Sequence, residues 1–445
     1  MRQGFASFLL ATLVNTAAAA PNIVLIVSDN QSQSLLGTYG NSTIRTPNID
    51  RLAAEGVQFN HAFAVNGVCS PTRATLMTGL LPSQTGVHVA LPTDVDVADW
   101  SAIEEFRNLP QTLSNAGYRT ALVGKYHLGA YEKPQLRFDF WVTFPGGHTT
   151  TFYDEVVIDN GKTYRSPEHL TDFWTRRAVD FIEQQSKERP FFLLLTYNGP
   201  YMLPPTVTMQ PKNRHADYYL RHTPAFPQEP VHPYLQNWAM GRDPSGLMLR
   251  EGTTAWTAIS AYNINMQVPL IFRHPGRIPG GIENDRIINQ VDILPTLLDY
   301  VGLGDLPIAN SPGRSFAAML AGEEIDWDDT VFFEFVTVRV IETPEWKYLR
   351  RFPPSDPREL YDLQADAGET RNLIDSPEHA DIVAALDARL AAYFEQYADP
   401  QYDLWNGGTA KGRLLEDHYG RDDIFSERFA DWRPPFVEKA KPFDH

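Results

Sequence analysis

The residues with the clearest chemical potential lie between Cys69 and Gly79, in the sequence CSPTRATLMTG. Cys69 is the only cysteine in the chain. Ser70 followed by Pro71 predicts a helix start, with a hydroxyl at the N-cap and proline at the first helical position. Arg73 lies four residues after Cys69, so we expect it to lean back over the start of that helix. Position 69 then meets free backbone N–H groups, the positive end of a helix dipole and a guanidinium, which suits a nucleophile or a bound oxyanion.

A lone cysteine has three interpretations here. It is a small buried hydrophobe, or a thiol activated by the helix end, or part of a known motif. The segment resembles the Cys-x-Pro-x-Arg signature of the type I sulfatases, in which a separate enzyme oxidises the cysteine to formylglycine. Ala74, Thr75 and Thr78-Gly79 extend the resemblance beyond the core of the signature.

The resemblance covers most of the chain and implies an alkaline-phosphatase-like α/β fold. That fold is a mixed, mostly parallel sheet flanked by helices, with a small C-terminal α+β subdomain. The expected divisions are a signal peptide over 1–20, a catalytic domain over 21–325, a subdomain over 326–400 and a tail of unknown role over 401–445.

The hydrophobic pattern gives the same fold class. The apolar run Asn22 to Ser28 predicts a strand buried on both faces, and it ends at Asp29-Asn30. Asp159-Asn160-Gly161 between short apolar runs predicts a hairpin. An amphipathic helix over 171–185 then leads into the apolar strand FFLLLTY. Strands that alternate with helices favour a mostly parallel sheet with helices on both faces.

Farther along, the alternating pattern over 330–350 predicts antiparallel strands, and a helix from about Pro377 to Tyr397 is expected to pack on them. The segment RELYDLQADAGETRNLI resembles the small C-terminal subdomain of the sulfatases.

Lys125 and His127 lie in GKYHLG, directly after a strand predicted over 119–123. At strand spacing both side chains point to one side. The segment resembles the family's Gly-Lys-x-His-Leu-Gly motif, whose lysine and histidine contact the sulfate. We therefore expect Cys69, Arg73, Lys125 and His127 to form one catalytic pocket. Removal of Lys125 or His127 is expected to reduce turnover with little loss of stability, because cleft charges rarely hold a fold together.

The resemblance also implies one divalent cation, Ca²⁺ or Mg²⁺, with Asp29, Asn30 and the modified Cys69 as ligands. All the expected ligands are oxygens, which suits a hard cation. The family's second pair of metal ligands and a later lysine are absent from the aligned sequence. The resemblance therefore implies either a sulfatase-like chain with an internal deletion near Ile259–Ser260, natural or from a faulty gene model, or a chain in which other residues replace the missing ligands. Those candidates are His215, Asp217, Asp243 and Glu251.

Such a deletion has structural consequences. The central sheet should lack a strand, and the strands beside the gap should have unpaired backbone groups and exposed apolar faces. Cation binding should be weak, because a hard cation prefers six or more oxygens.

The net charge limits the choice of binding partners, and the N-terminal sequence predicts the cellular location. The net charge of −17 over 445 residues argues against nucleic acid as the main partner. Arg2, an apolar run from Phe8 to Val14 and the alanines at 18–20 predict a secretory signal, hence a periplasmic or secreted protein; the alternative is a disordered or core-docked N-terminus. No apolar stretch is long enough to span a membrane.

Three functions stay open. The first is hydrolysis of a sulfate ester, with sulfated carbohydrates as the expected substrates. A formylglycine-generating enzyme is then the maturation partner. The second is a phosphodiesterase or phosphonate monoester hydrolase, because relatives use the same signature. The third is a pseudo-enzyme that binds sulfated glycans. Oligomeric state is not indicated by the sequence.

Overall fold

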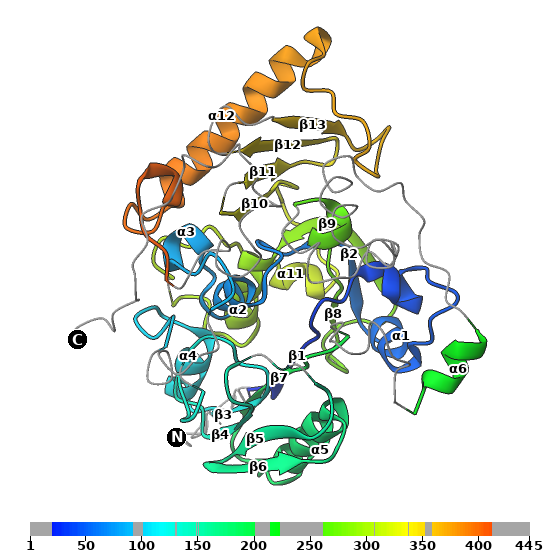
Figure 1. Ribbon diagram of the computed structural model, residues 1–445, viewed down its shortest axis with the longest axis vertical. Helices are drawn as coiled ribbons and strands as arrows, with labels where there is room; N and C mark the ends of the chain where they lie inside the picture. Colours follow the sequence, from blue (N-terminus) through cyan, green and yellow to red (C-terminus); the bar gives the residue numbers. More distant parts are fainter. Residues whose placement is uncertain are drawn as a thin grey trace, which may run out of the picture.

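The computed structural model describes residues 20–91, 101–129, 131–147, 149, 151–200, 214–222, 261–306, 308–336, 338–351 and 358–411. Figure 1 shows two sheets and their helices in the lower body, and a C-terminal sheet with one long helix above them. The predicted signal peptide up to residue 19, the junction at Ile259–Ser260 and the tail beyond residue 411 lie outside the described residues.

The largest sheet has six strands in the order β1-β7-β3-β4-β5-β6. Its strands are β1 (Ile23–Val27), β7 (Phe191–Thr196), β3 (Arg119–Gly124), β4 (Phe140–Thr143), β5 (Glu155–Asp159) and β6 (Lys162–Ser166). The first four are parallel, and β5 and β6 are added antiparallel. The predicted hairpin is confirmed: Asn160 and Gly161 connect β5 to β6 with positive φ angles of 48° and 82°, which a two-residue turn of this kind requires.

Helices cover both faces of this sheet, as the sequence predicted. On one face, Phe173 and Phe181 of α5 (Leu170–Glu183) pack in one apolar cluster with Val123 of β3. On the other, Leu113 of α4 (Leu109–Asn115) packs in a second cluster with Leu122. Neighbouring residues of β3 thus enter opposite cores, because side chains alternate along a strand. The parallel strands are held between two layers, with their carboxyl ends at a common edge.

A second sheet of three strands has the order β8-β2-β9. Its strands are β8 (Leu270–Phe272), β2 (Val57–Phe63) and β9 (Ile282–Asn289). β2 is parallel to β9 and antiparallel to β8.

The expected burial of β1 on both faces is wrong, because this edge strand has exposed apolar side chains on one face. Among the described strands β1 pairs only with β7. Val24 and Ile26 are 43% and 53% exposed. Their register partners Leu193 and Leu195 belong to the cluster beneath α5, so that cover stops short of β1. An apolar surface beside an unpaired edge was expected if a neighbouring strand is missing, and the described part of the chain has this surface.

The C-terminal part is an antiparallel sheet of four strands, as expected from the alternating pattern. They are β10 (Val331–Phe335), β11 (Val338–Glu342), β12 (Trp346–Arg351) and β13 (Glu359–Asp362). The long helix α12 (Ala380–Tyr397) lies along it (Figure 1). Val383, Leu386 and Leu390 of this helix pack with Ile341 and Tyr348 of the sheet. The expected helix start at Pro377 is a short 3-10 turn, η6 (Pro377–His379), which continues directly into α12.

The remaining helical elements connect the sheets. The α-helices are α1 (Pro47–Ala54), α2 (Cys69–Thr78), α3 (Pro82–Thr85), α6 (Ala216–Arg221), α9 (Asn263–Met266), α10 (Ile293–Tyr300) and α11 (Ala317–Leu320), and the 3-10 turns are η1 (Gln33–Leu35), η2 (Gly37–Tyr39), η5 (Gln290–Asp292) and η7 (Leu404–Asn406). Within the described part of the chain, no helix has the length and apolarity needed to cross a bilayer.

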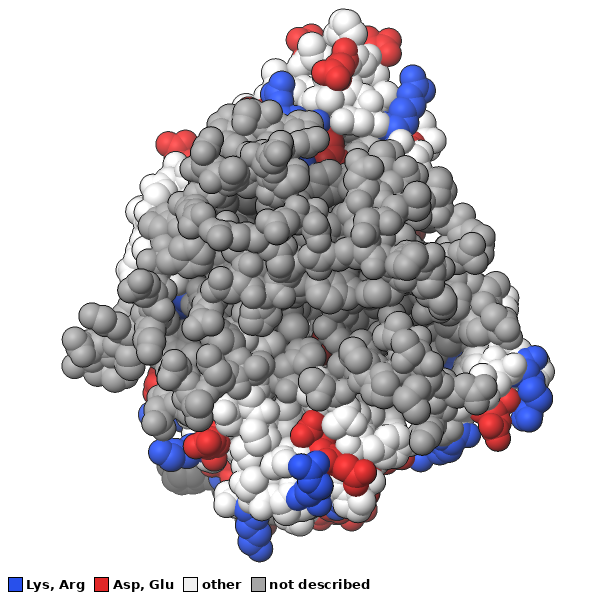
Figure 2. All heavy atoms as spheres, in the orientation of Figure 1, with Lys and Arg blue, Asp and Glu red and all other residues white. Residues whose placement is uncertain are grey.

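On the face shown in Figure 2, the charged side chains of described residues lie near the rim. Lys and Arg are interspersed there with Asp and Glu. Mixed charges of this kind are typical of a solvated surface, and they do not form a basic patch on this part of the molecule.

The turn after β3 gives the first testable prediction. Gly124 has a φ of 111°, and a Cβ atom there would lie 1.8 Å from the carbonyl oxygen of Thr196. Gly117 has a similar φ of 91° but no atom within 4 Å of that position. Both Gly→Ala substitutions strain the backbone, and only Gly124→Ala also forces β3 and β7 apart. We expect Gly124→Ala to cost roughly 1–3 kcal/mol more than Gly117→Ala in thermal unfolding. Equal losses would contradict the steric argument.

Candidate active site

Position 69 lies at the first residue of α2. The N-cap is Val68, with φ −105° and ψ 146°, and its side chain makes no capping hydrogen bond. Cys69 is a free thiol of intermediate exposure. The first N–H groups of a helix have no partner inside the helix, and α2 is long enough, at ten residues, to have a dipole. The predicted placement of Cys69 at a helix N-terminus is therefore confirmed.

The predicted role of Ser70 as the N-cap is wrong. The helix begins one residue earlier, and Ser70 Oγ accepts a hydrogen bond from the N–H of Leu91 at 3.0 Å. Ser70 is fully buried, and its hydrogen-bond partner lies 21 positions away in the sequence. Pro71 then occupies the third helical position, where its missing N–H costs no intrahelical hydrogen bond.

A buried cluster of three charges lies beside α2. Lys125 Nζ is 2.6 Å from Asp29 Oδ2, and Arg73 Nη2 is 3.6 Å from the same oxygen. Arg73 Nη1 also donates to the backbone carbonyl of Lys125 at 2.7 Å. All three side chains are less than a tenth exposed. One carboxylate against two cations leaves an excess of positive charge, so the cluster suits a bound anion.

The three residues come from different elements. Asp29 follows β1, Arg73 belongs to the first turns of α2, and Lys125 follows β3. Polar residues after parallel strands meet at the carboxyl edge of a sheet, where open α/β folds place their sites. The expected convergence of Arg73 and Lys125 is therefore present, with Asp29 as their shared partner.

The strand spacing assumed for Lys125 and His127 is wrong. β3 ends at Gly124, and His127 has a positive φ of 52°. His127 is buried, and its Nε2–H donates to the carbonyl of Leu91 at 3.0 Å. Because Leu91 also donates its N–H to Ser70 Oγ, His127 is connected to the start of α2. Its proximity to the site thus depends on a turn and on Leu91, not on strand alternation.

Asp29 and Asn30, the predicted metal ligands, lie just after β1. Asn30 follows Asp29 with a φ of 58°, a left-handed conformation that asparagine tolerates. However, Asp29 Oδ2 already contacts the Lys125 ammonium. In the described part of the chain, no group of three or more His, Cys, Asp or Glu side chains could hold a metal ion. These donors do not make up a complete site for a hard cation, which prefers six or more oxygens.

Of the four replacement ligands considered from the sequence, two lie within the described residues. His215 and Asp217 lie at the start of α6. The neighbouring Arg214 pairs with Asp172 of α5, and Tyr218 of α6 lies under Arg45. Asp243 and Glu251 lie outside the described residues.

Asn66 is a site residue that the sequence analysis missed. It is 1% exposed, and its side-chain oxygen accepts a hydrogen bond from the N–H of Val68 at 2.8 Å. Asparagine commonly forms such a bond two residues ahead. The position of Asn66 just before the start of α2 was the sequence feature that could have identified it.

The fold and the site together define an α/β protein with a buried cluster of one carboxylate and two cations at the carboxyl edge of a parallel sheet. A sequence model described as Sulfatase matches residues 21–238, and one described as N-sulphoglucosamine sulphohydrolase, C-terminal, matches residues 258–396. The chain belongs to the sulfatase family.

Similar proteins agree with this assignment. An N-acetylglucosamine-6-O-sulfatase of Bacteroides thetaiotaomicron is 24% identical, over 89% of this chain and 90% of its own length. The human N-acetylgalactosamine-6-sulfatase is 32% identical over 45% of this chain and 44% of its own. A solved structure described as in complex with its substrate D-glucosamine-2-N,6-O-disulfate has a TM-score of 0.66 at 22% identity, and covers 85% of this chain and 98% of its own. The predicted fold class is thereby confirmed.

The alignment with the Bacteroides thetaiotaomicron protein spans 518 positions, more than the 445 residues of this chain. That relative therefore contains residues without a counterpart here. Insertions in relatives are what an internal deletion in this chain would produce.

The burial of Lys125 changes one expectation. Its side chain is 2% exposed and is paired with a carboxylate that is almost as deeply buried, so it is not a cleft charge of little structural weight. Lys125→Met removes the ammonium and leaves the Asp29 carboxylate beside the Arg73 guanidinium, at 3.6 Å. Breaking a buried pair costs roughly 3–5 kcal/mol.

We expect Lys125→Met to lower the unfolding free energy by an amount in that range, measured by urea denaturation. The double variant Asp29→Asn/Lys125→Met should recover part of the loss, because no buried carboxylate is left without its ammonium. Additive losses would contradict this pairing. Arg176→Met is the control, since the Arg176–Glu168 pair is about half exposed and should contribute less than about 1 kcal/mol.

Proposed function

We propose that this chain hydrolyses a sulfate ester of a carbohydrate, with formylglycine made from Cys69 as the reactive group. The observation that carries this proposal is the placement of Cys69 at the N-terminus of α2, beside the cluster of Arg73, Lys125 and Asp29. A hydrated aldehyde at position 69 supplies two hydroxyls, one to attack sulfur and a second to release sulfate; a serine or thiol lacks the second.

The chain's own residues provide the electrostatic part. The helix N-terminus, Arg73 and Lys125 offer N–H donors and positive charge to the sulfate oxygens, where charge develops during the reaction. Asp29 fixes the Lys125 ammonium, so that cation needs little reorientation when an anion binds. His127 donates its Nε2–H to Leu91, which sets its tautomer and leaves Nδ1 as the proton acceptor of the ring.

The names of the relatives support a substrate class. Two of them are named as 6-sulfatases of N-acetylglucosamine and N-acetylgalactosamine. We propose a 6-O-sulfated N-acetylhexosamine unit as the first substrate to test. We also propose that the protein is exported, either periplasmic or secreted, and that a formylglycine-generating enzyme is its maturation partner.

The test uses protein made with and without such a maturation enzyme. The peptide that spans Cys69 should show the thiol-to-aldehyde mass difference only in the first case. Only the matured protein should release sulfate from 6-O-sulfated N-acetylglucosamine, and Cys69→Ala should abolish release. A phosphodiester and a phosphonate monoester serve as competing substrates. Faster turnover of either, or an unmodified thiol in the maturing host, would contradict the proposal.

The same proposal includes a cation that binds weakly. We propose that Asp29, Asn30 and the modified residue 69 hold one Ca²⁺ or Mg²⁺ with low affinity. Titration of the full chain with Ca²⁺ should give a dissociation constant above roughly 10⁻⁴ M, the range of the weakest protein sites, and Asp29→Asn should remove this binding. A stoichiometric ion retained through dialysis would contradict weak binding.

A second candidate is a protein that binds sulfated glycans without turnover. It is supported by the pairing of Asp29 with Lys125 and by the lack, among the described residues, of a group of three or more His, Cys, Asp or Glu side chains that could hold a metal ion. Binding of 6-O-sulfated N-acetylglucosamine by matured protein, without sulfate release at saturating Ca²⁺, would identify this function.

A further inference from the structure

We propose that Asn66 is a positioning residue that fixes position 69 against the C-terminal sheet. The inference rests on the proposed role of position 69 in the reaction. Asn66 lies three residues before Cys69, in the loop between β2 and α2. Its proposed effect on the reaction passes through the backbone that carries Cys69 and does not require contact with a reacting group.

The first step is the local geometry of the loop. Asn66 Oδ1 accepts a hydrogen bond from the N–H of Val68, and the backbone carbonyl of Asn66 accepts one from the hydroxyl of Thr72. The N–H of Thr72 in turn donates to the carbonyl of Val68 at 3.1 Å. The N-cap residue is thus held from both sides, although its own side chain makes no cap.

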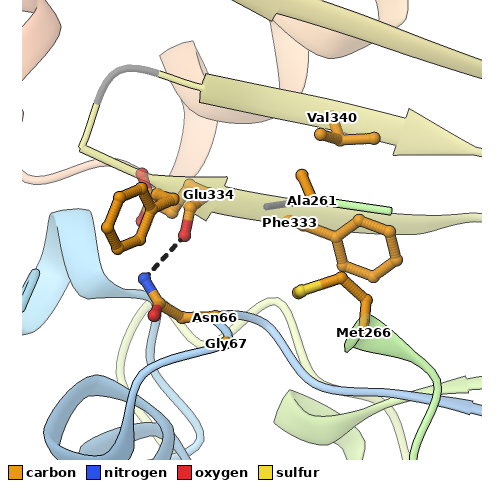
Figure 3. A pocket seen from close by; sticks show the side chains of 8 residues that line it. Asn66, Gly67, Ala261, Met266, Phe333, Glu334 and Val340 are labelled. Carbon is orange, nitrogen blue, oxygen red and sulfur yellow. Dashed lines mark hydrogen bonds between the residues drawn. The ribbon is translucent and has the colours of Figure 1, made fainter. Parts of the chain in front are cut away.

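The second step is the connection to the C-terminal sheet. Asn66 Nδ2 donates to the backbone carbonyl of Glu334 in β10 at 2.9 Å, and Figure 3 shows the amide pointing at that oxygen. The N–H of Glu334 donates to the carbonyl of Val65 at 3.0 Å. The Glu334 carboxylate accepts a hydrogen bond from the N–H of Ser83 in α3 at 2.6 Å. β10 is therefore a fixed support for the loop, joined to it by two reciprocal bonds.

The third step is the small cavity beneath the loop. Asn66 and Gly67 border a cavity of about 10 Å³, whose other walls include Ala261, Met266 and Phe333 (Figure 3). That volume is close to the room needed by one water molecule. Gly67 has no side chain to fill it, whereas the flanking Val65 and Val68 are buried in apolar clusters. The hydrogen bonds of Asn66 therefore act together with this packing to set where the helix start lies.

The experiment needs a readout that does not depend on sulfatase activity. Protein made without the maturation enzyme keeps Cys69 as the only thiol of the chain, so its alkylation by iodoacetamide reports the position of residue 69 directly. Asn66→Ala removes both side-chain bonds and should raise the alkylation rate of the folded protein by at least about tenfold, because two restraints on the helix start are lost together. Thr72→Val removes a single bond and should give a smaller increase.

The matched control is Asn108→Ala. Asn108 is also fully buried, and its side chain likewise accepts from a backbone N–H, that of Gln111, and donates to a backbone carbonyl, that of Phe106. It caps α4, and its side-chain hydrogen bonds stay within residues 106–111, so none of them reaches the loop before α2. Asn108→Ala should lower the melting temperature about as much as Asn66→Ala and leave the alkylation rate within about twofold of the wild type.

In matured protein, Asn66→Ala should lower kcat by about tenfold with KM changed less than about threefold, and Asn108→Ala should change neither to that extent. Unchanged alkylation in both Asn66→Ala and Thr72→Val, or equal acceleration in Asn108→Ala, would overturn the inference. If matured wild type releases no sulfate, the proposed function fails, while the alkylation rates still decide the role of Asn66. If Asn66→Ala does not fold, Thr72→Val decides by the same criterion.

Discussion

The site depends on one buried carboxylate shared by two cations. Asp29 alone at the end of β1 would be costly to bury, as would Lys125 at the end of β3. Their contact at 2.6 Å, with Arg73 nearby, makes the burial of each charge possible. Because the three residues come from two strands and a helix, the pocket can form only after the sheet and α2 have come together. The charge cluster and the tertiary contacts of the sheet with α2 therefore form in the same step.

The second constraint is that the helix carrying Cys69 is held by residues far away in sequence. Asn66 connects it to β10, and Ser70 connects it through Leu91 to His127. The C-terminal sheet is thus part of the support of the pocket, although it contributes no charge to the cluster around Asp29.

Much of the fold could be predicted, because its signals are local. The apolar runs of β1 and β7, the Asp-Asn-Gly turn and the alternating C-terminal strands each follow from short-range chemistry. The details of the site could not, since they depend on long-range contacts. Ser70 fails as an N-cap because Leu91 uses its hydroxyl. The burial of Lys125 and the support of Asn66 by Glu334 depend on partners 96 and 268 residues away.

The register of β1 has a consequence for synthesis of the chain. Ile23 pairs with Phe192, so an apolar strand made near the beginning waits for a partner about 170 residues later. At a translation rate of about 5–20 residues per second, that interval lasts on the order of ten to thirty seconds. During it, the backbone donors and acceptors of β1 are open to other chains. Other unfolded chains can therefore compete for this strand, and a bound chaperone would change the yield of folded protein more than its final stability.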